Sequence, residues 1–417
     1  MFRVLAFLIG LLVAVLGWNT SVFLAVSEGW FKSAIVDSSS SGDFIEASRN
    51  IVASDHPGNF GMILIDQGDI AGRYFMSSGA PVNGSSVFQV ASLGKWITAW
   101  GVMALVEDGV VDLDRPVSDY LTRWALPDGQ FDNSAVTVRL LLSHTAGLGD
   151  GLGYDGFAQP ESLQSLEDSL TRALDASPGN SGVVKVDADP GSQWSYSGGG
   201  YTILQLLIEE TSGQPFADFM SKRMFQPLGM QHTSFKYEEA SEFGLAENFD
   251  LNGNTEPFRW YSALAAASLF TSVDDLSVFL TAQVKPEGQT VLSKDSLELM
   301  RIPHASQMGE EIWGLGPMLY AANNQGGYII GHDGNNEPAI NTVARIDPAT
   351  GDGIVILSTG SDTLATRIAG EWVFWKTGNI DNLMFLMSFG TMLLWMGSGS
   401  VAIVAIAAVF GVVRRRQ

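Results

Sequence analysis

The sequence predicts an α/β (α+β) fold, in which one antiparallel sheet is built from both ends of a globular domain and flanked by helices. Strand-like runs lie near both ends of this domain, at 61–65, 71–76, 327–334, 340–348 and 352–360. The stretch between them, about 115–285, consists mainly of helical segments separated by Gly/Pro loops. We therefore expect a mainly helical lobe inserted into the sheet.

The first part of the domain combines a hairpin with a helix. Runs 61–65 and 71–76 flank a Gly-Asp turn, which is typical of a β-hairpin. Apolar residues then follow a helical spacing over 92–107, and this pattern stops at Gly109. A last helix, 362–376, is expected to close the domain.

Two helices are predicted within the lobe, at 200–213 and 272–284. Ser272 followed by Asp275 resembles a capping box, although Asp replaces the usual Glu or Gln. We therefore expect the second helix to begin at Ser272. The Gly-rich run 147–156 does not follow a clear strand, so we interpret it as a flexible loop near a cleft rather than a nucleotide-binding turn.

Composition limits the possible functions. The 417 residues are 46% hydrophobic, which is enough for a large domain, and the formal charge of −22 disfavours nucleic acid and anionic lipid as main partners. The chain has no cysteine, which excludes disulfides, thiolate zinc sites and cysteine nucleophiles. No paired spacing of metal ligands occurs either, so we expect neither a metal nor another cofactor.

Both ends of the chain are apolar enough to enter a membrane. Residues 1–26 are either a cleaved signal peptide or an N-terminal anchor. Residues 383–413 carry no charge and are long enough to span a bilayer, and three arginines follow at 414–416. Positive residues mark the cytoplasmic side, so we expect the C-terminus inside the cell and the acidic domain outside it.

The expected order along the chain follows from these segments. We predict a signal peptide or anchor, a linker, the globular domain, a second linker, a transmembrane helix and a basic cytoplasmic tail, at 1–26, 27–44, 45–376, 377–382, 383–413 and 414–417 respectively.

The stretch "QVASLGKWITAW" (89–100) places a lysine in an otherwise apolar run. On a helix, Ser92 and Lys95 lie on one face, so the amine can reach the hydroxyl. A serine needs a base to act as a nucleophile, and desolvation by apolar neighbours such as Trp96 and Trp100 makes an amine a better base. If Ser92 opens a helix, its backbone N–H is free to face developing negative charge. The elbow motif G-x-S-x-G is absent from the sequence.

Several longer blocks occur in order with this motif: "VEDGVVDLDRPVSDYL" (106–121), "TVRLLLSHTAGL" (137–148), "PGSQWSYSGGGYTIL" (190–204), "FQPLGMQHTSF" (225–235), "AASLFTSVDDLSVFL" (266–280) and "GHDG" (331–334). Over residues 45–375 the pattern resembles the serine β-lactamase and penicillin-binding protein superfamily. The branch it resembles contains class C β-lactamases, D-alanyl-D-alanine carboxypeptidases and β-lactamase-like esterases. This resemblance implies a β-lactamase/transpeptidase-like fold.

The resemblance also implies roles for individual residues. Ser92 matches the nucleophile, and Lys95 matches the residue that accepts or shuttles its proton. Tyr196 matches a tyrosine that acts as a partner base and as the acid toward the leaving group. The oxyanion would be bound by the backbone N–H groups of Ser92 and of Asn335, which follows Gly334. His144, which could otherwise serve as a base, is expected to be structural.

Two elements depart from the family pattern and bear on the substrate. Gly198 replaces the asparagine that usually contacts the acyl side chain of the substrate. The family has Lys-Thr-Gly or His-x-Gly where this sequence has "GHDG", so His332 and Asp333 stand in place of a Lys-Thr pair that suits a substrate carboxylate. If Asp333 points into the cleft it disfavours acidic substrates, and if it points along the other face of its strand it does not. The sequence leaves this orientation open.

These observations predict a membrane-anchored, extracytoplasmic serine hydrolase of a bacterial cell (inner) membrane, with its catalytic domain in the periplasm. It would form an acyl-enzyme with an ester or amide, as an esterase, a D-amino-acid peptidase or carboxypeptidase, or a weak β-lactamase. The expected partners are a small-molecule or peptide substrate and the membrane, and no nucleic acid. The alternative is a catalytically idle penicillin-binding or scaffold protein of the cell envelope.

Overall fold

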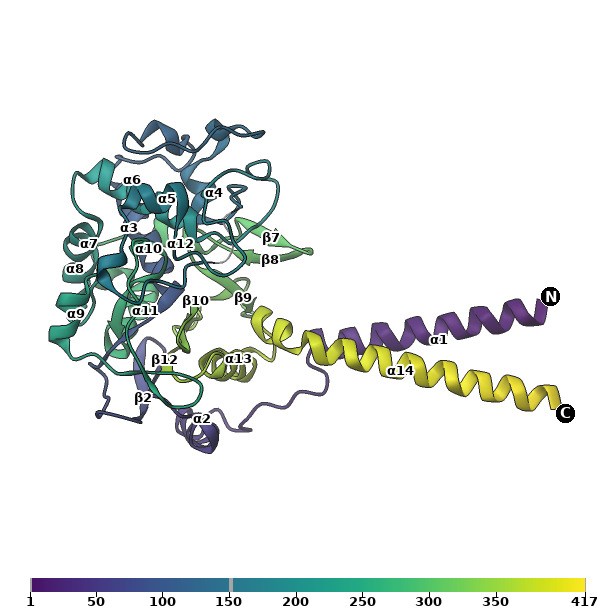
Figure 1. The fold of residues 1–417 in the computed structure, drawn as a ribbon. Coiled ribbons are helices and arrows are strands. Elements are labelled where there is room, and N and C mark those ends of the chain that lie inside the picture. The colour runs from purple at the N-terminus through teal and green to yellow at the C-terminus, as the bar shows by residue number, and fades with distance from the viewer. Residues whose placement is uncertain (1, 150–152, 417) are drawn as a thin grey trace. The chain divides into compact units, whose positions relative to one another are not determined.

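The computed structural model describes residues 2–149 and 153–416, so part of the predicted loop at 147–156 lies outside the described residues. The chain divides into two compact units. One unit is Ser38–Ala369, which holds the sheet and the helical lobe (Figure 1). The other combines Met1–Asp37 with Gly370–Gln417 and holds the two long terminal helices. Each unit is described below by itself.

The larger unit is built on an eight-stranded antiparallel sheet with the order β2-β1-β12-β11-β10-β9-β8-β7. Its strands are β1 (Phe60–Asp66), β2 (Asp69–Met76), β7 (Ala305–Gln307), β8 (Glu310–Trp313), β9 (Met318–Ala322), β10 (Tyr328–Asn336), β11 (Ile340–Ile346) and β12 (Gly353–Thr359). The first strand pairs with the last, from Phe60 opposite Ser358 to Ile65 opposite Gly353. The prediction of one sheet formed from both ends of the domain is confirmed.

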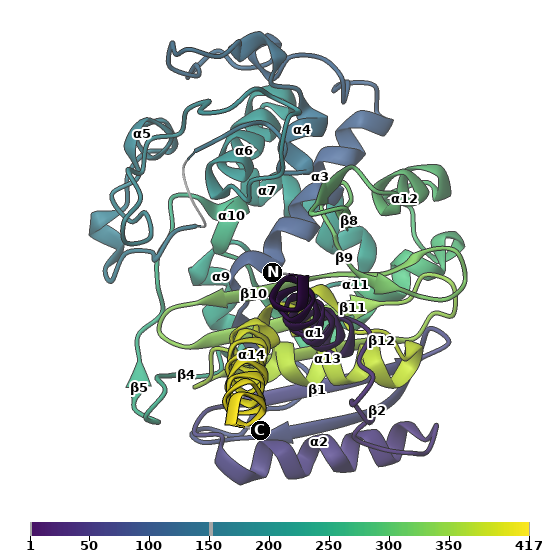
Figure 2. The same cartoon turned by 90° about the vertical axis from the view of Figure 1, so that its right-hand side faces the viewer.

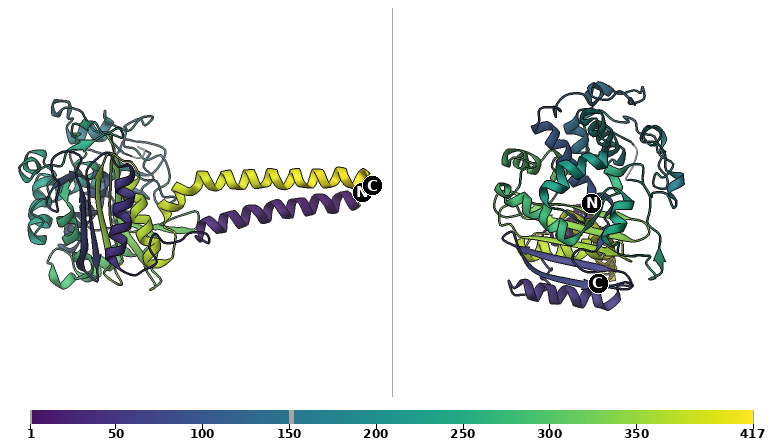
Figure 3. Two further views of the ribbon diagram at one scale, coloured as in Figure 1. Left: turned by 90° about the horizontal axis from the view of Figure 1, so that it is seen from below. Right: turned by 90° about the vertical axis from the view of Figure 1, so that its left-hand side faces the viewer.

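Helices cover both faces of this sheet, as Figures 2 and 3 show. Helix α2 (Ser41–Asp55) packs Ile45 against Gly72 of β2, and the start of α13 (Leu364–Thr377) lies on the same face. Helix α11 (Val273–Val284) packs Val273 against Gly61 on the opposite face, where α3 (Gly94–Glu107) also lies. Because both faces are covered, β11 and β12 are buried along their whole length.

The helical lobe lies between the hairpin and the C-terminal strands in sequence. Its further elements are α4 (Val138–Leu142), α5 (Leu166–Arg172), α6 (Gly198–Ser212), α7 (Phe216–Met220), α8 (Gln226–Leu228), α9 (Tyr237–Phe243), α10 (Leu264–Ala267) and α12 (Lys294–Arg301). Two small sheets join β3 (Val87–Gln89) to β6 (Phe270–Ser272) and β4 (Asn248–Phe249) to β5 (Thr255–Glu256).

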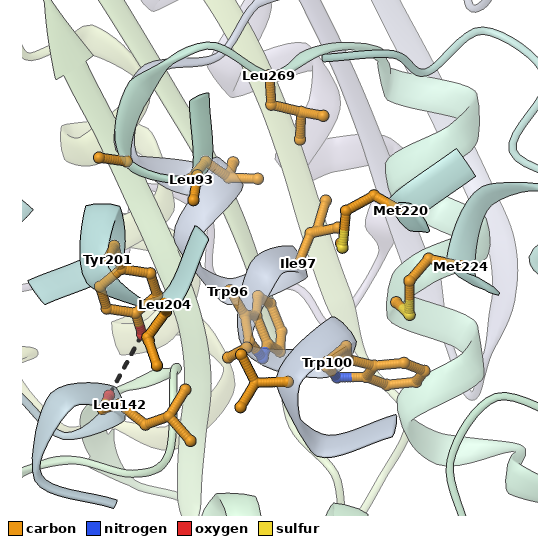
Figure 4. Close-up of a cluster of buried hydrophobic side chains, with 14 of the residues drawn as sticks. Leu93, Trp96, Ile97, Trp100, Leu142, Tyr201, Leu204, Met220, Met224 and Leu269 are labelled. Carbon is orange, nitrogen blue, oxygen red and sulfur yellow. Dashed lines mark hydrogen bonds between the residues drawn. The ribbon is translucent and has the colours of Figure 1, made fainter. Parts of the chain in front are cut away.

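Helix α3 runs through the centre of the core. Twelve of its fourteen residues are buried, including Trp96 and Trp100. Figure 4 shows their indole rings among side chains from several elements: Leu93, Ile97, Leu142, Tyr201, Leu204, Met220, Met224 and Leu269. The segment that carries the predicted nucleophile is therefore held by packing on all sides.

The serine and glycine signals in the sequence correctly mark the start of α11 and the ends of α3 and α6. Ser272 accepts a hydrogen bond from the Asp275 N–H at 3.1 Å and caps α11, as its capping pattern indicates. Gly109 and Gly213 follow α3 and α6 with φ of 71° and 67°, the left-handed conformation that ends a helix.

One helix begins in a segment that was predicted to be a linker. Helix α2 begins at Ser41, inside the segment 27–44 that the sequence analysis assigned to a linker. The last serines of this Ser-rich run begin the helix: Ser40 is its N-cap and accepts a hydrogen bond from the Asp43 N–H at 3.4 Å. Phe44 and Val52 then become fully buried.

The smaller unit contains two antiparallel helices, α1 (Phe2–Ser27) and α14 (Asn382–Arg416) (Figure 1). Within the described chain, Val4–Ser27 and Asn382–Gly411 are the segments long and apolar enough to cross a membrane by length and composition. Helix α14 begins at Asn382, at the end of the predicted linker 377–382. The side chains of the predicted tail, 414–417, lie outside the described residues.

Candidate active site

Ser92 lies in a single 3-10 turn, Ala91–Leu93, directly before α3. The regular helix therefore begins two residues later than the predicted start at Ser92. Ala91 has a φ of 51°, a conformation that non-glycine residues rarely adopt. The turn is fixed on both sides of Val90: its N–H donates to Leu269 O at 2.9 Å, and its carbonyl accepts from Thr342 Oγ1 at 2.9 Å.

Lys95 lies next to Ser92 and is almost fully buried, with 1% of its surface exposed. Its Nζ atom is 2.9 Å from Ser92 Oγ and donates a hydrogen bond to Ala266 O at 2.6 Å. The carbonyl of Ala266 holds the amine in place, which keeps Nζ directed at the serine. This is the geometry that general-base activation of a serine requires.

The Tyr196 side chain completes this group, and Ser92 is the hydrogen-bonding neighbour that acts on the pKa of its hydroxyl. The ring centroid of Tyr196 lies 5.0 Å from Lys95 Nζ. Burial raises the pKa of Tyr196 above its usual value, and the hydrogen bond to Ser92 opposes this only in part. The phenol therefore keeps its proton at neutral pH and can donate it to a hydrogen bond.

Strand β10 approaches the Ser92 turn with two residues, His332 and Gly334. A Cβ atom at Gly334 would collide with the carbonyl oxygen of Val90 and with Thr342 Oγ1. Only glycine fits there, because the strand and the turn are in direct backbone contact. The backbone of Asn335, one residue further on, is therefore adjacent to the same turn.

The side chain of Asp333 lies on the opposite face of β10, since alternate residues of a strand point to opposite sides. Its carboxylate pairs with Arg345 Nη2 at 3.0 Å and accepts hydrogen bonds from Tyr320 Oη at 2.5 Å and Thr366 Oγ1 at 2.7 Å. The structure thus answers the question that the sequence leaves open: the Asp333 carboxylate is not brought to Ser92.

The Asn335 side chain also faces away from the turn. Its Nδ2 atom donates to the carbonyl of Asp362 at 2.5 Å. Any contact between Asn335 and a substrate at Ser92 would therefore involve its backbone N–H, as the sequence analysis expects.

His332 is buried on the Ser92 side of β10, with 1% of its surface exposed. Its Nδ1 atom is 2.6 Å from the carbonyl of Asp333, so Nδ1 carries the proton and donates it. Burial, followed by the charge of Lys95, lowers the pKa of His332 to about 4. The imidazole is therefore neutral at pH 7 and presents the Nε2 lone pair.

His144 supports the tyrosine segment and does not contact Ser92. Its Nδ1 atom accepts a hydrogen bond from the Ser197 N–H at 3.1 Å, and its ring packs 4.4 Å from that of Tyr196. Burial, with a smaller effect of the Lys95 charge, lowers the pKa of His144 well below its usual value. A neutral, buried imidazole in this place positions Tyr196.

Gly198 begins α6, two residues after Tyr196. A Cβ atom at this position would lie 2.9 Å from Tyr154 Cε2, so the tyrosine ring occupies the space that a side chain would need. The Tyr154 hydroxyl is 2.9 Å from Thr202 Oγ1, which fixes the ring in place.

Comparison with known proteins shows the family to which this chain belongs. The profile described as Beta-lactamase matches residues 50–374. The chain belongs to the β-lactamase family. It is 31% identical to penicillin-binding protein 4 of Amycolatopsis lactamdurans over 324 residues, which covers 73% of this chain and 81% of that protein.

Two further proteins resemble this β-lactamase family chain. Esterase EstB of Burkholderia gladioli is 33% identical over 193 residues, covering 44% of this chain and 46% of the esterase. The solved structure of D-amino acid amidase from Ochrobactrum anthropi SV3 superposes with a TM-score of 0.59 at 22% identity, covering 78% of this chain and 96% of the amidase. The predicted fold and the predicted family are both confirmed.

In this β-lactamase family protein the structure brings together Ser92, Lys95, Tyr196, His332 and the backbone at Gly334. Gly198 lies against the Tyr154 ring. The side chains of Asp333 and Asn335 lie on the face of the sheet that is turned away from Ser92.

Sequence reasoning missed the aromatic neighbours of the site. Trp194 and Trp313 have ring centroids 6.4 Å and 5.7 Å from that of Tyr196. Trp194 is two residues from Tyr196, so its position could have been inferred. Trp313 comes from β8, and no local signal connects it to Tyr196.

Proposed function

We propose that this protein is a membrane-anchored serine hydrolase that cleaves a neutral ester or amide through an acyl-enzyme on Ser92. The observation that supports it most directly is the position of Lys95 Nζ, which is 2.9 Å from Ser92 Oγ and 5.0 Å from the ring centroid of Tyr196. Burying a lysine destabilises the fold, whereas a lysine amine held beside a serine hydroxyl can activate that serine as a nucleophile. The buried Lys95 is therefore better explained by catalysis than by folding.

In the proposed acylation step, Ser92 Oγ attacks the carbonyl carbon of the substrate and Lys95 Nζ takes the hydroxyl proton. The carbonyl π bond breaks, and the negative charge on its oxygen is stabilised by the backbone N–H groups of Ser92 and Asn335. Collapse of this intermediate breaks the bond to the leaving group, which receives a proton through the Tyr196 hydroxyl. Lys95 then returns its proton to Tyr196.

Deacylation repeats these transfers with water. A water molecule loses a proton to the Lys95 and Tyr196 pair and attacks the acyl carbon. Ser92 Oγ leaves and recovers its proton, and the acid product departs. Each group ends in the state in which it began, so no cofactor enters the proposed cycle.

A neutral substrate is favoured by what β10 presents to Ser92. His332 is neutral at pH 7, and the cation that contacts Asp333, Arg345, lies on the opposite face. Neither suits the carboxylate of a penicillin or of a peptidyl-D-alanine. The similarity to an esterase and to a D-amino acid amidase agrees with ester or amide cleavage.

For the location, we propose that α1 is retained and pairs with α14 as a transmembrane hairpin in a bacterial cell membrane. Trp18 Nε1 donates to Trp395 O at 3.0 Å, and Asn19 Nδ2 donates to Ser400 Oγ at 3.3 Å. Polar contacts of this kind stabilise helix pairs in lipid. A signal peptide that is removed after export would not form a lasting pair with α14. Both termini would be cytoplasmic and the catalytic domain periplasmic.

The test compares the purified full-length protein with Ser92→Ala and with a control, Ser192→Ala. Ser192 lies in an exposed turn of the segment that leads to Tyr196, and its hydroxyl donates to the nearby carbonyl of Asp189 at 2.6 Å. We expect Ser92→Ala to lose fluorophosphonate labelling and to reduce the hydrolysis of a short-chain aryl ester by about four orders of magnitude or more. A chromogenic cephalosporin and a D-alanyl-D-alanine peptide should be poorer substrates. Full activity of Ser92→Ala contradicts the mechanism.

The alternative, an idle penicillin-binding or scaffold protein, has one observation in its favour. The Tyr154 ring fills the space beside Gly198, the position at which the family pattern implies an asparagine for the substrate. This alternative predicts labelling of Ser92 by a fluorophosphonate or a fluorescent penicillin without turnover of any of the three substrates.

A further inference from the structure

We propose that Trp194, Trp313 and His332 form a substrate subsite for a neutral aromatic group that carries a hydroxyl or amide. This inference rests on the proposed function, because the subsite is assigned to the substrate that Ser92 attacks. It deepens that function by naming the chemical class which the site selects.

The three rings form one continuous aromatic surface around Tyr196. The centroids of Trp194 and Trp313 are 5.7 Å apart, and those of Trp313 and His332 are 5.5 Å apart. Both tryptophans and His332 lie within 6.4 Å of the Tyr196 ring, measured between centroids. Since the Tyr196 ring centroid lies 5.0 Å from Lys95 Nζ, which is itself 2.9 Å from Ser92 Oγ, this surface adjoins the reacting atoms.

Exposure differs along this surface in a way that suits a bound ring. Trp313 and His332 are buried, at 2% and 1% exposure, whereas Trp194 and Tyr196 are half-buried. A planar group can therefore contact the exposed part of Trp194, whose ring centroid lies 5.7 Å from that of the buried Trp313. Offset or edge-to-face contacts between aromatic rings add stabilisation beyond the area that they bury.

The polar atoms of the surface are unpaired. Trp194 Nε1, Trp313 Nε1 and His332 Nε2 are all buried and have no hydrogen-bond partner within residues 2–149 and 153–416. Buried polar atoms are normally satisfied, and leaving them without partners is costly. The two indole nitrogens can only donate, and His332 Nε2 can only accept, because Nδ1 carries the proton.

This mixture of donors and an acceptor selects the ligand chemistry. A hydroxyl or an amide can donate to His332 Nε2 and also accept from an indole N–H. A carboxylate accepts hydrogen bonds but cannot donate one, so it leaves the lone pair of His332 Nε2 unsatisfied. The negative charge of the carboxylate is also repelled by that lone pair. Lys95 is engaged with Ser92 and Ala266, and Arg345 with Asp333, so neither is placed to compensate for that charge.

Boronic acids test the subsite, because they bond reversibly to an active serine and leave the attached group free to vary. The probes are n-butyl-, phenyl-, 3-hydroxyphenyl- and 3-carboxyphenylboronic acid, each competing with a fluorescent fluorophosphonate on the full-length protein. We expect the phenyl probe to bind about tenfold more tightly than the butyl probe. The hydroxyphenyl probe should bind most tightly and the carboxyphenyl probe least tightly of the three aromatic probes.

Variants assign these preferences to the named residues. Trp194→Ala should remove the advantage of phenyl over butyl, and Trp194→Phe should keep most of it. His332→Gln, whose amide can donate, should narrow the gap between the carboxyphenyl and phenyl probes. Trp124→Ala is the control, since Trp124 is a half-buried tryptophan that bonds to Thr171 elsewhere in the lobe. Thermal unfolding of each variant separates lost binding from lost folding.

The outcomes separate this proposal from the one on which it rests. If the wild type binds phenyl and butyl probes equally, or Trp194→Ala weakens both alike, the subsite is wrong while the serine hydrolase proposal stands. If a carboxyphenyl probe binds as tightly as hydroxyphenyl, the assigned role of His332 is wrong. If Ser92 takes up neither a boronic acid nor the fluorophosphonate, both proposals fail.

Discussion

The pairing of Asp333 with Arg345 is the clearest case in which one residue has a structural role that the sequence alone does not reveal. Arg345 is fully buried and Asp333 is its carboxylate partner, so removing the acid leaves an uncompensated buried charge. We expect Asp333→Ala to lower the free energy of unfolding by about 3–5 kcal/mol. The kcat/KM of the molecules that remain folded should stay close to that of the wild type.

Urea unfolding and activity, measured on the same preparations, check this prediction. The double variant Asp333→Ala with Arg345→Met should recover much of the lost stability, because it removes the orphaned cation as well. An unchanged midpoint of unfolding together with a large fall in kcat/KM would instead place Asp333 in contact with the substrate.

Asp175 makes a second prediction at this scale, on pH dependence. Burial, with a contribution from the nearby charge of Asp155, raises the pKa of Asp175 to about 6. A raised carboxyl pKa in the folded state means that stability is highest at low pH and is lost as the pH rises through about 6. The pKa difference of about two from the unfolded chain corresponds to about 3 kcal/mol at pH 8.

Replacing Asp175 by Asn should therefore stabilise the protein at pH 8 and have a clearly smaller effect at pH 4.5, which lies between the unfolded and folded pKa values. Thermal unfolding of both proteins at the two pH values measures this difference. Equal effects of the substitution at both pH values would show that the carboxyl group does not titrate differently in the folded and unfolded states.

Single residues of the site were predictable to different degrees. Ser92, Lys95 and Tyr196 belong to motifs whose spacing carries their chemistry, so the sequence indicates all three. Strand alternation implies that His332 and Asp333 face opposite sides, but not which side faces Ser92. That choice depends on partners far along the chain, such as Thr366 for the Asp333 carboxylate. The Tyr154 ring beside Gly198 is likewise a contact across 44 positions that no local pattern encodes.

At the scale of elements, the pairing of α1 with α14 can be tested by cross-linking, because the chain has no native cysteine. Asn19 and Ser400 are in hydrogen-bond contact, so cysteines at both positions should form a disulfide on mild oxidation. With a protease site inserted at 38–41, the two fragments of the cut chain should remain linked until they are reduced. A gel run with and without reductant reads this directly.

A matched pair of cysteines at Val13 and Val401 controls for collisions in the membrane, since both side chains are largely exposed on their helices. It should not link the two fragments. A disulfide dimer of whole chains from the Asn19 and Ser400 variant would mean that the helices pair between molecules. Loss of α1 from the mature protein, seen by mass spectrometry, would identify it as a signal peptide.

Elements with internal periodicity and clear caps were the predictable ones. Helices α3, α6 and α11 combine apolar spacing with a glycine or serine at one end, and the structure confirms all three. Helix α2 was not predicted, because its few apolar residues cover only part of one helix face and give a weak helical periodicity. Its register is fixed by packing Ile45 on β2, a contact that forms only in the folded sheet.

At the scale of the whole molecule, the formal charge of −22 should affect which substrates reach Ser92. A strongly negative protein repels anions over roughly a Debye length, about 10 Å at 0.1 M salt. We expect the kcat/KM for an aryl ester carrying a carboxylate to rise several-fold between about 10 mM and 150 mM NaCl, as screening weakens the repulsion. The matched neutral ester should change little. A parallel rise for both esters would point to a salt effect on the enzyme itself.

The overall architecture was predictable because its signal is distributed over many residues. Strand-like runs at both ends of the domain and helical spacing between them imply one sheet with an inserted lobe, whichever individual boundaries shift. The order of the eight strands, by contrast, depends on pairings between distant segments.

The pairing of β1 with β12 has a consequence for how the protein is made. Phe60 lies opposite Ser358, so the hairpin of β1 and β2, whose strands are the first of the sheet to leave the ribosome, gains its central neighbour only near the end of synthesis. Until then one edge of β1 has unpaired backbone groups and can recruit other chains. Closing such a long loop is also slow. Nascent chains that stop before Gly353 should therefore aggregate or require a chaperone, and those that include β12 should become protease-resistant.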